Sequence, residues 1–145
     1  MKMKTDYGLL DGSEQQIKTL TKRLMLSNWW GKKQEDTLPN LLLDCVNHVR
    51  VKMLYSPKDF RFHIILTDSD NINSIQMNLY GKIRYPKIPS FVSLSRKTIY
   101  VNIDKINRKV LYHEIGHLMF NDLIDNKRVG SSLHEHIAQF CENKC

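Results

Sequence analysis

Residues His113-Glu114-Ile115-Gly116-His117 form an H-E-x-x-H motif. On a helix, two residues four apart lie on one face about 6 Å from each other, so both imidazoles can reach one Zn²⁺ at about 2.0–2.1 Å. Glu114 then lies beside the metal, where its carboxylate can take a proton from a bound water. The composition of the chain gives roughly 0.008 such motifs by chance, so the motif indicates a metal-dependent hydrolase.

The motif alone does not complete a catalytic zinc site, which needs a third protein ligand and an open position. The last part of the chain offers His134, Glu135 and His136, which project in different directions on a helix, so only one or two of them can face the metal. On this reasoning the third ligand is any of the three. Peptide hydrolysis also needs a donor that stabilises the oxyanion, and the candidates are Tyr112, His134, His136 and Arg128.

The elements that carry these residues can be predicted from caps and apolar spacing. Asp104 or Asn107 is expected to cap the helix that holds the motif. Gly116 lies between the two histidines and lowers helix propensity, which is tolerable if another element approaches the helix closely there. A last helix is expected to start at Leu133 with Ser132 as its cap.

The middle of the chain has the alternation and turn residues of strands. A largely buried strand is predicted at residues 60–66 and another at 75–83, where Gly81 suggests a bulge or bend. Residues 91–94 and 98–103 flank a short polar connection and are expected to form a hairpin.

The N-terminal part is predicted to be helical. Ser13 and Gln16 have the spacing of a capping box for a first helix, and Trp29-Trp30-Gly31 are expected to mark its end. A second helix is predicted to begin near Pro39 and to end before Ser56-Pro57.

This order of elements predicts an α+β fold: a small domain with N-terminal helices, a three- to four-stranded, mostly antiparallel sheet, the H-E-x-x-H helix and a C-terminal ligand helix. The length of 145 residues predicts one domain over 1–145. Within it we expect a mainly helical part at 1–57, the sheet at 58–104 and the metal-site helices at 105–145.

The net charge of +7 is unevenly distributed, since no acidic residue lies between Asp70 and Asp104. Two interpretations are open: a solvated face, or a positive rim that attracts an acidic or nucleic-acid-associated partner. The second would suit a non-catalytic binding module on a degenerate peptidase scaffold, although no helix-turn-helix or zinc-finger spacing supports nucleic-acid binding. The basic residues of this window are Lys82, Arg84, Lys87, Arg96 and Lys97.

Targeting and redox features are sparse. The N-terminus has no apolar run of the kind found in signal peptides, and no stretch approaches the roughly 18 apolar residues of a membrane span, so we expect a cytoplasmic protein without membrane contact. Cys45, Cys141 and Cys145 are too few for a disulfide framework. Two interpretations of Cys141 and Cys145 are open: reduced thiols, or ligands that join His134 or His136 in a second, structural metal site. The sequence leaves the oligomeric state open.

Three stretches together resemble the ImmA/IrrE-type metallopeptidases of bacteria and their mobile elements. They are the strand at 100–103, the H-E-x-G-H residues His113 to His117 with Leu118, and the E-x-x-A segment from Glu135 to Ala138. The resemblance covers the chain from about Phe91 to Phe140.

The resemblance implies a zincin-like domain and a gluzincin-like site with His113, His117 and Glu135 as zinc ligands and Glu114 as general base. It also implies that the strand around residues 98–103 pairs with the backbone of a substrate. Members of the family cleave helix-turn-helix repressors of mobile-element or stress genes, so the implied activity is that of an endopeptidase with one specific protein partner.

Overall fold

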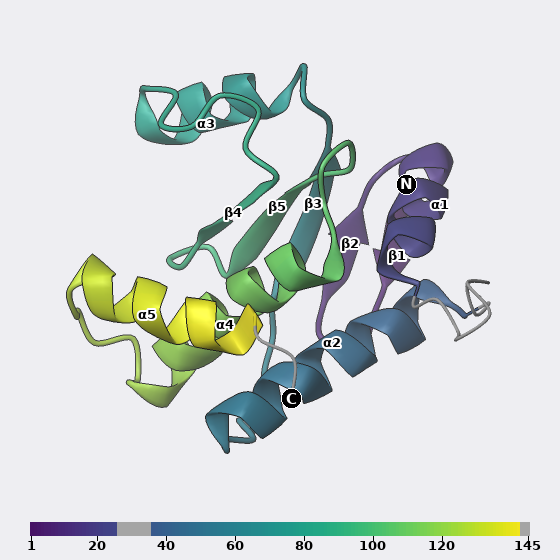
Figure 1. Cartoon of the computed structure of the whole chain (residues 1–145). Coiled ribbons are helices and arrows are strands. Elements are labelled where there is room, and N and C mark those ends of the chain that lie inside the picture. Colours follow the sequence, from purple (N-terminus) through teal and green to yellow (C-terminus); the bar gives the residue numbers. More distant parts are fainter. Residues whose placement is uncertain (26–35, 143–145) are drawn as a thin grey trace.

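The computed structural model describes residues 1–25 and 36–142 (Figure 1). Strands and helices follow one another along the chain as β1 (Lys2–Lys4), β2 (Leu9–Asp11), α1 (Glu14–Leu24), α2 (Leu38–Met53), β3 (His63–Thr67), α3 (Ile72–Tyr80), β4 (Ser90–Ser93), β5 (Thr98–Asn102), α4 (Arg108–Leu123) and α5 (Ser131–Glu142). The protein therefore has a mixed α/β fold, and no helix within the described residues is long and apolar enough to cross a membrane.

The strands form one open sheet in the order β1-β2-β3-β5-β4. The two central pairs, β2 with β3 and β3 with β5, are parallel, while the two outer pairs are antiparallel. The prediction of a three- to four-stranded, mostly antiparallel sheet was therefore wrong in both strand number and direction. Strands β1 and β2 are only three residues long, which is too short for an alternating pattern to be recognised in the sequence.

The predicted hairpin is confirmed as β4 and β5. One of its strands lies inside the sheet and the other at its edge. β5 lies between β3 and β4, and all five of its residues are buried. An interior strand has no free backbone edge, so the expectation that residues 98–103 pair with a substrate was wrong. β4 is the strand at the end of the sheet.

The predicted strand at 75–83 is helix α3. Its apolar residues alternate from Ile75 to Leu79 as they would in a strand, but the buried positions are Ile72 and Gln76, which lie four apart on one helical face. Gly81 has φ of 70° and forms the left-handed C-cap of this helix. The glycine that suggested a bulge therefore ends a helix.

The N-terminal helices begin as predicted. The capping box of Ser13 and Gln16 is present, with Gln16 N–H donating to Ser13 Oγ at 3.1 Å. Pro39 lies in the first turn of α2. α1 ends at Leu24, earlier than expected, and the stretch 29–31 that was predicted to end it lies outside the described residues.

The core joins the sheet to α1, α2 and α4. α2 and α4 contact each other on one side of the sheet, whereas α3 lies at its other end beside β4 (Figure 1). Each apolar side chain buried here contributes about 1.5–3 kcal/mol to stability. Among the largest fully buried side chains are Leu42, Val46, Val49, Ile99, Leu111, Ile115 and Met119.

The contact between α4 and α5 depends on Gly116. A Cβ at this position would lie only 3.1 Å from both the Cβ and the Sγ of Cys141 on α5. The expected close approach at the glycine between the two histidines is therefore confirmed. Because α5 crosses directly over this point, its residues come within reach of the motif on α4.

Candidate metal centre

The side chains of His113, His117 and Glu135 converge on one point between α4 and α5. The two Nε2 atoms are 3.2 Å apart, and Glu135 Oε1 lies 2.8 Å from His117 Nε2 and 3.3 Å from His113 Nε2. Ligand atoms around a tetrahedral ion at about 2.0–2.1 Å are themselves separated by roughly 3.3 Å. These three residues could hold a metal ion, and the donor set is one that zinc uses.

The other two candidates for third ligand lie elsewhere. His134 is buried and directs its Nδ1 at the Nδ1 of His117, on the side of that ring away from Glu135. The side chain of His136 is exposed and is not part of the convergent group formed by His113, His117 and Glu135. Among the three candidates in this segment, only Glu135 meets both histidines of the motif.

Both motif histidines have a partner on the ring nitrogen that faces away from the convergence point. His113 Nδ1 contacts a carboxylate oxygen of Glu142, and His117 Nδ1 lies 3.3 Å from His134 Nδ1. Such contacts fix the orientation and tautomer of a metal-binding imidazole. Sequence reasoning missed Glu142, although it follows Glu135 by seven residues and therefore lies two turns along the same face of α5.

Glu142→Ala is expected to lower the affinity for zinc by about 10–100-fold, because the ring of His113 loses the group that orients it. Glu142→Gln keeps an oxygen that can accept from the Nδ1 hydrogen and should retain more of the affinity. A competition titration against a chromogenic chelator measures both variants. Equal zinc affinity of the alanine variant and the wild type would show that Glu142 does not position His113.

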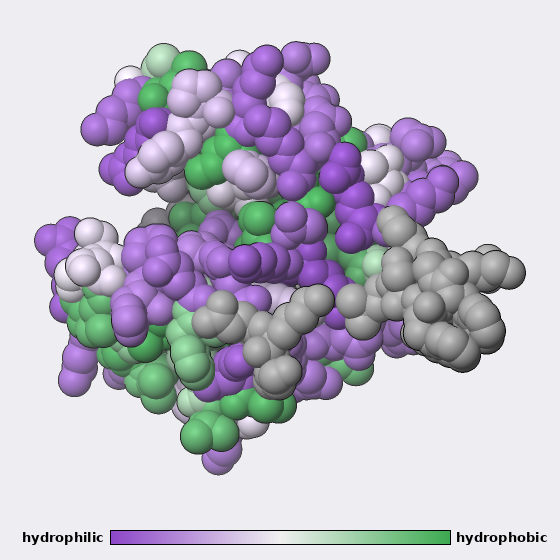
Figure 2. All heavy atoms as spheres, in the orientation of Figure 1, coloured by the Kyte–Doolittle hydropathy of each residue, from purple (hydrophilic) through white to green (hydrophobic). Residues whose placement is uncertain are grey.

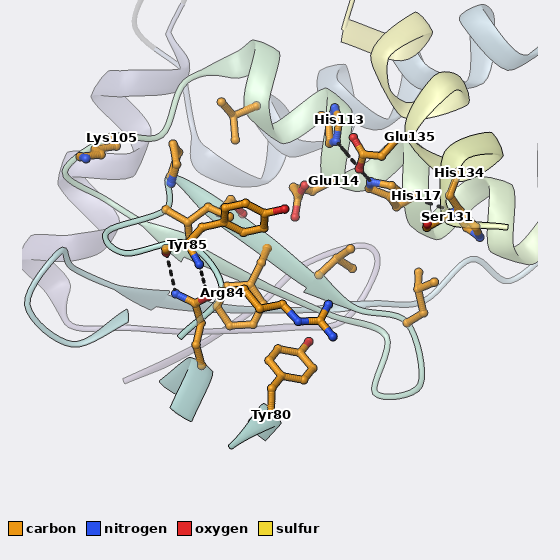
Figure 3. Close-up of a pocket in the computed structure, with 18 of the residues that line it drawn as sticks. Tyr80, Arg84, Tyr85, Lys105, His113, Glu114, His117, Ser131, His134 and Glu135 are labelled. Carbon is orange, nitrogen blue, oxygen red and sulfur yellow. Dashed lines mark hydrogen bonds and ion pairs between the residues drawn. The ribbon is translucent and has the colours of Figure 1, made fainter. Parts of the chain in front are cut away.

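Glu114 is buried beside this group (Figure 3). Its side chain is only 6% exposed, and its Oε2 has no hydrogen-bond partner among the described residues. Burial, together with the charges of Glu135 and Glu142, raises the pKa of Glu114 to about 8. A general base beside a metal must have an oxygen that is free to take a proton from water. The unpartnered Oε2 of Glu114 meets this requirement.

The pKa shifts of His117 and Glu135 favour the protonation states in which these residues bind metals. Burial and the neighbouring His113 lower the pKa of His117, and burial lowers the pKa of His134. Burial opposes ionisation of Glu135, but the charges of His113 and His117 together bring its pKa below the ordinary value. Neutral imidazoles and an ionised carboxylate are the ligand forms.

The raised pKa of Glu114 gives the metal-free protein a specific pH dependence. The folded protein keeps this carboxyl protonated up to about pH 8, whereas the unfolded chain loses the proton near the ordinary pKa of 4.5. The contribution of Glu114 to stability should therefore fall as the pH rises between these values, on the order of several kcal/mol in total. Glu114→Gln cannot ionise, so its free energy of unfolding relative to wild type should rise from pH 5 to pH 8 in urea titrations with chelator. A pH-independent difference would contradict the burial of a neutral Glu114.

The convergent group lies on the wall of a cleft of about 850 Å³ that separates α4 and α5 from α3 and the segment that follows it. Figure 2 shows the hollow between these two parts of the molecule. Figure 3 shows His113, Glu114, His117 and Glu135 facing the cleft from one side and Tyr80, Arg84 and Tyr85 from the other.

The sequence-based candidates for an oxyanion donor do not face this cleft freely. Tyr112 is buried, stacks on His48 at 3.8 Å between ring centroids and accepts a hydrogen bond from Arg108. Arg128 and His136 are not among the residues that line the cleft. His134 lines it but directs its Nδ1 at His117.

Comparison with protein-family models, curated proteins and solved structures finds nothing that matches this chain. The similarity to ImmA/IrrE-type metallopeptidases is therefore carried by the motif residues alone. The geometry of the site stands independently of it.

Proposed function

We propose that this protein is a zinc-dependent endopeptidase. The observation that carries the proposal is the convergence of His113, His117 and Glu135 on one point beside the buried carboxyl of Glu114. A structural zinc site would be closed by four protein ligands, whereas the described residues bring together three. Three ligands on the wall of an open cleft are the arrangement of a hydrolytic site.

In the proposed mechanism His113, His117 and Glu135 would hold the ion. Zinc bound in such a site would act as a Lewis acid, lowering the pKa of a bound water toward about 7 and polarising the scissile carbonyl. Glu114, whose ionised form would be favoured beside a bound cation, accepts the proton of the attacking water on Oε2 and later gives it to the leaving amine. The unpartnered state of this oxygen leaves it available for that proton.

The free edge of β4 is suited to align a substrate. Asn102 N–H donates to the Pro89 carbonyl at 3.0 Å, and in this register Phe91 also directs its backbone toward β5. Ser90 and Val92 then direct their backbone groups toward the open side of the sheet. Both residues line the cleft, so a peptide added to this edge would pass the convergent group.

For the substrate we propose one specific regulatory protein, such as the helix-turn-helix repressor of a mobile element. This part of the proposal is supported by the resemblance of the motif residues to ImmA/IrrE-type metallopeptidases. A cleft open along one strand edge is compatible with cleavage of an extended segment of such a protein.

The proposal predicts that activity follows the metal. The purified protein should carry about one zinc per chain, lose endopeptidase activity when a chelator removes it and regain activity when one equivalent is restored. Metal analysis alongside cleavage of an internally quenched peptide library and of candidate repressors measures this. A chain that takes up zinc at the site but cleaves none of these substrates would overturn the proposal.

The alternative of a non-catalytic binding module rests on the basic window. Three of its five residues line two separate pockets: Arg84 and Lys87 line the cleft, whereas Lys97 lines a small pocket with Arg61. Salt-sensitive DNA binding by the metal-free protein would favour this alternative, and no binding at low salt would count against it.

A further inference from the structure

The proposed peptidase lacks one chemical component among the residues described so far, a donor that faces the carbonyl oxygen of the scissile peptide. Figure 3 shows a candidate on the opposite wall of the cleft. The side chain of Tyr85 extends across the cleft, and its hydroxyl points toward Glu114. Tyr85 follows α3 and lies between the strand predicted at 75–83 and the predicted hairpin, and it was not among the site residues predicted from the sequence.

The backbone of Tyr85 is fixed by a buried side chain. Gln76 is only 2% exposed; its Nε2 donates to the Tyr85 carbonyl at 3.0 Å, and its Oε1 accepts from the Tyr85 N–H at 3.3 Å. Two residues further on, Lys87 N–H donates to Asn73 Oδ1 at 2.8 Å. Both contacts connect the segment to α3, which explains why a glutamine is buried there. A fixed backbone holds the side chain of Tyr85 over the cleft.

The hydroxyl of Tyr85 is free to bind a substrate. Tyr85 is 64% exposed, and its hydroxyl has no hydrogen-bond partner among the described residues. The neighbouring Tyr80 differs, because the guanidinium of Arg84 lies 5.1 Å from its ring centroid and its ring packs edge-on against Phe91. Of the two tyrosines on this wall, Tyr85 is the one whose hydroxyl faces the metal-binding residues.

We propose that the Tyr85 hydroxyl donates a hydrogen bond to the scissile carbonyl oxygen as this oxygen becomes an oxyanion. The inference rests on the proposed peptidase function. The water oxygen bonds to the carbonyl carbon, the carbonyl electron pair moves to the oxygen that Tyr85 contacts, and Glu114 takes the proton of the water. When the C–N bond breaks, that proton passes to the leaving amine and the carbonyl re-forms. Tyr85 keeps its own proton throughout.

The test uses Tyr85→Phe, with Tyr80→Phe as a matched loss of one hydroxyl from the same wall. With a quenched peptide that the zinc-loaded wild type cleaves, Tyr85→Phe should lower kcat by about 10²–10³-fold and leave KM nearly unchanged, because the hydrogen bond forms only in the transition state. Tyr80→Phe should cleave like wild type. Equal kcat of Tyr85→Phe and wild type would overturn the assignment.

Two measurements that do not depend on turnover separate the possible roles. Binding of a phosphonamidate peptide, a tetrahedral analogue, should weaken by at least about 10²-fold in Tyr85→Phe. The absorption spectrum of the Co²⁺-substituted resting protein should be the same for Tyr85→Phe and wild type. A difference would show that Tyr85 is a metal ligand and not a hydrogen-bond donor.

If the zinc-loaded wild type neither cleaves peptides nor binds the phosphonamidate, the peptidase function fails and the role of Tyr85 fails with it. A wild type that does both beside an unaffected Tyr85→Phe refutes the role of Tyr85 alone.

Discussion

Glu114→Gln is expected to reduce kcat for peptide cleavage by about 10²–10⁴-fold while zinc remains bound. The substitution keeps the size of the side chain but removes its ability to accept a proton. The convergent atoms belong to His113, His117 and Glu135, so the metal ligands are unchanged. The carboxyl is buried, and its Oε2 has no hydrogen-bond partner among the described residues, so the substitution breaks no described hydrogen bond at that atom.

The measurement compares turnover and zinc content of the same preparation. Glu14→Gln, which makes the same chemical change at an exposed position on α1, serves as the matched control and should behave like wild type. Undiminished cleavage by Glu114→Gln would exclude Glu114 as the general base. Loss of zinc from this variant would instead indicate that Glu114 takes part in holding the metal.

The parts of the site that could be predicted from the sequence are those fixed by local geometry. The spacing of four between His113 and His117 places both rings on one face of any helix, and Asn107 caps that helix as expected. Gly116 indicated a close approach before the approaching element was known. Such features depend on a few neighbouring residues, so they can be inferred without knowing the rest of the fold.

The parts that could not be predicted depend on contacts between distant segments. α3 was mistaken for a strand because its alternating apolar residues are not its buried ones, and its buried Gln76 is satisfied only by the backbone of Tyr85. The opposite wall of the cleft follows from that contact, so it was missed as well. Strand β1 is held by pairing with β2, and β2 by pairing with β3, so neither has a signal of its own in the sequence.

The third ligand shows where local reasoning ends. On a helix, His134, Glu135 and His136 point in three directions, and which of them meets the motif depends on how α5 is rotated against α4. Packing of Cys141 and Ala138 against Gly116 sets this rotation. With that face of α5 in contact with α4, Glu135 reaches both motif histidines and His136 is exposed.

Glu135→Ala is therefore expected to strip zinc from the protein, with a loss of affinity larger than the about 10–100-fold that removal of an orienting partner causes. The reason is that Glu135 supplies one of three convergent ligand atoms and the remaining two imidazoles cannot hold the ion alone. His136→Ala changes the adjacent position on the same helix, where the side chain is exposed, and should bind zinc like wild type. Metal analysis after dialysis against a weak chelator distinguishes the two variants.

The reverse result would be equally informative. If only His136→Ala lost zinc, α5 would have to be rotated by about 100° relative to α4. That rotation would remove Ala138 and Cys141 from Gly116 and Glu142 from His113. Far-ultraviolet circular dichroism and urea unfolding of both variants with chelator present show whether each one folds without metal, so that loss of a ligand is separated from loss of the fold. A folded Glu135→Ala that releases zinc, beside a folded His136→Ala that keeps it, would establish Glu135 as the third ligand.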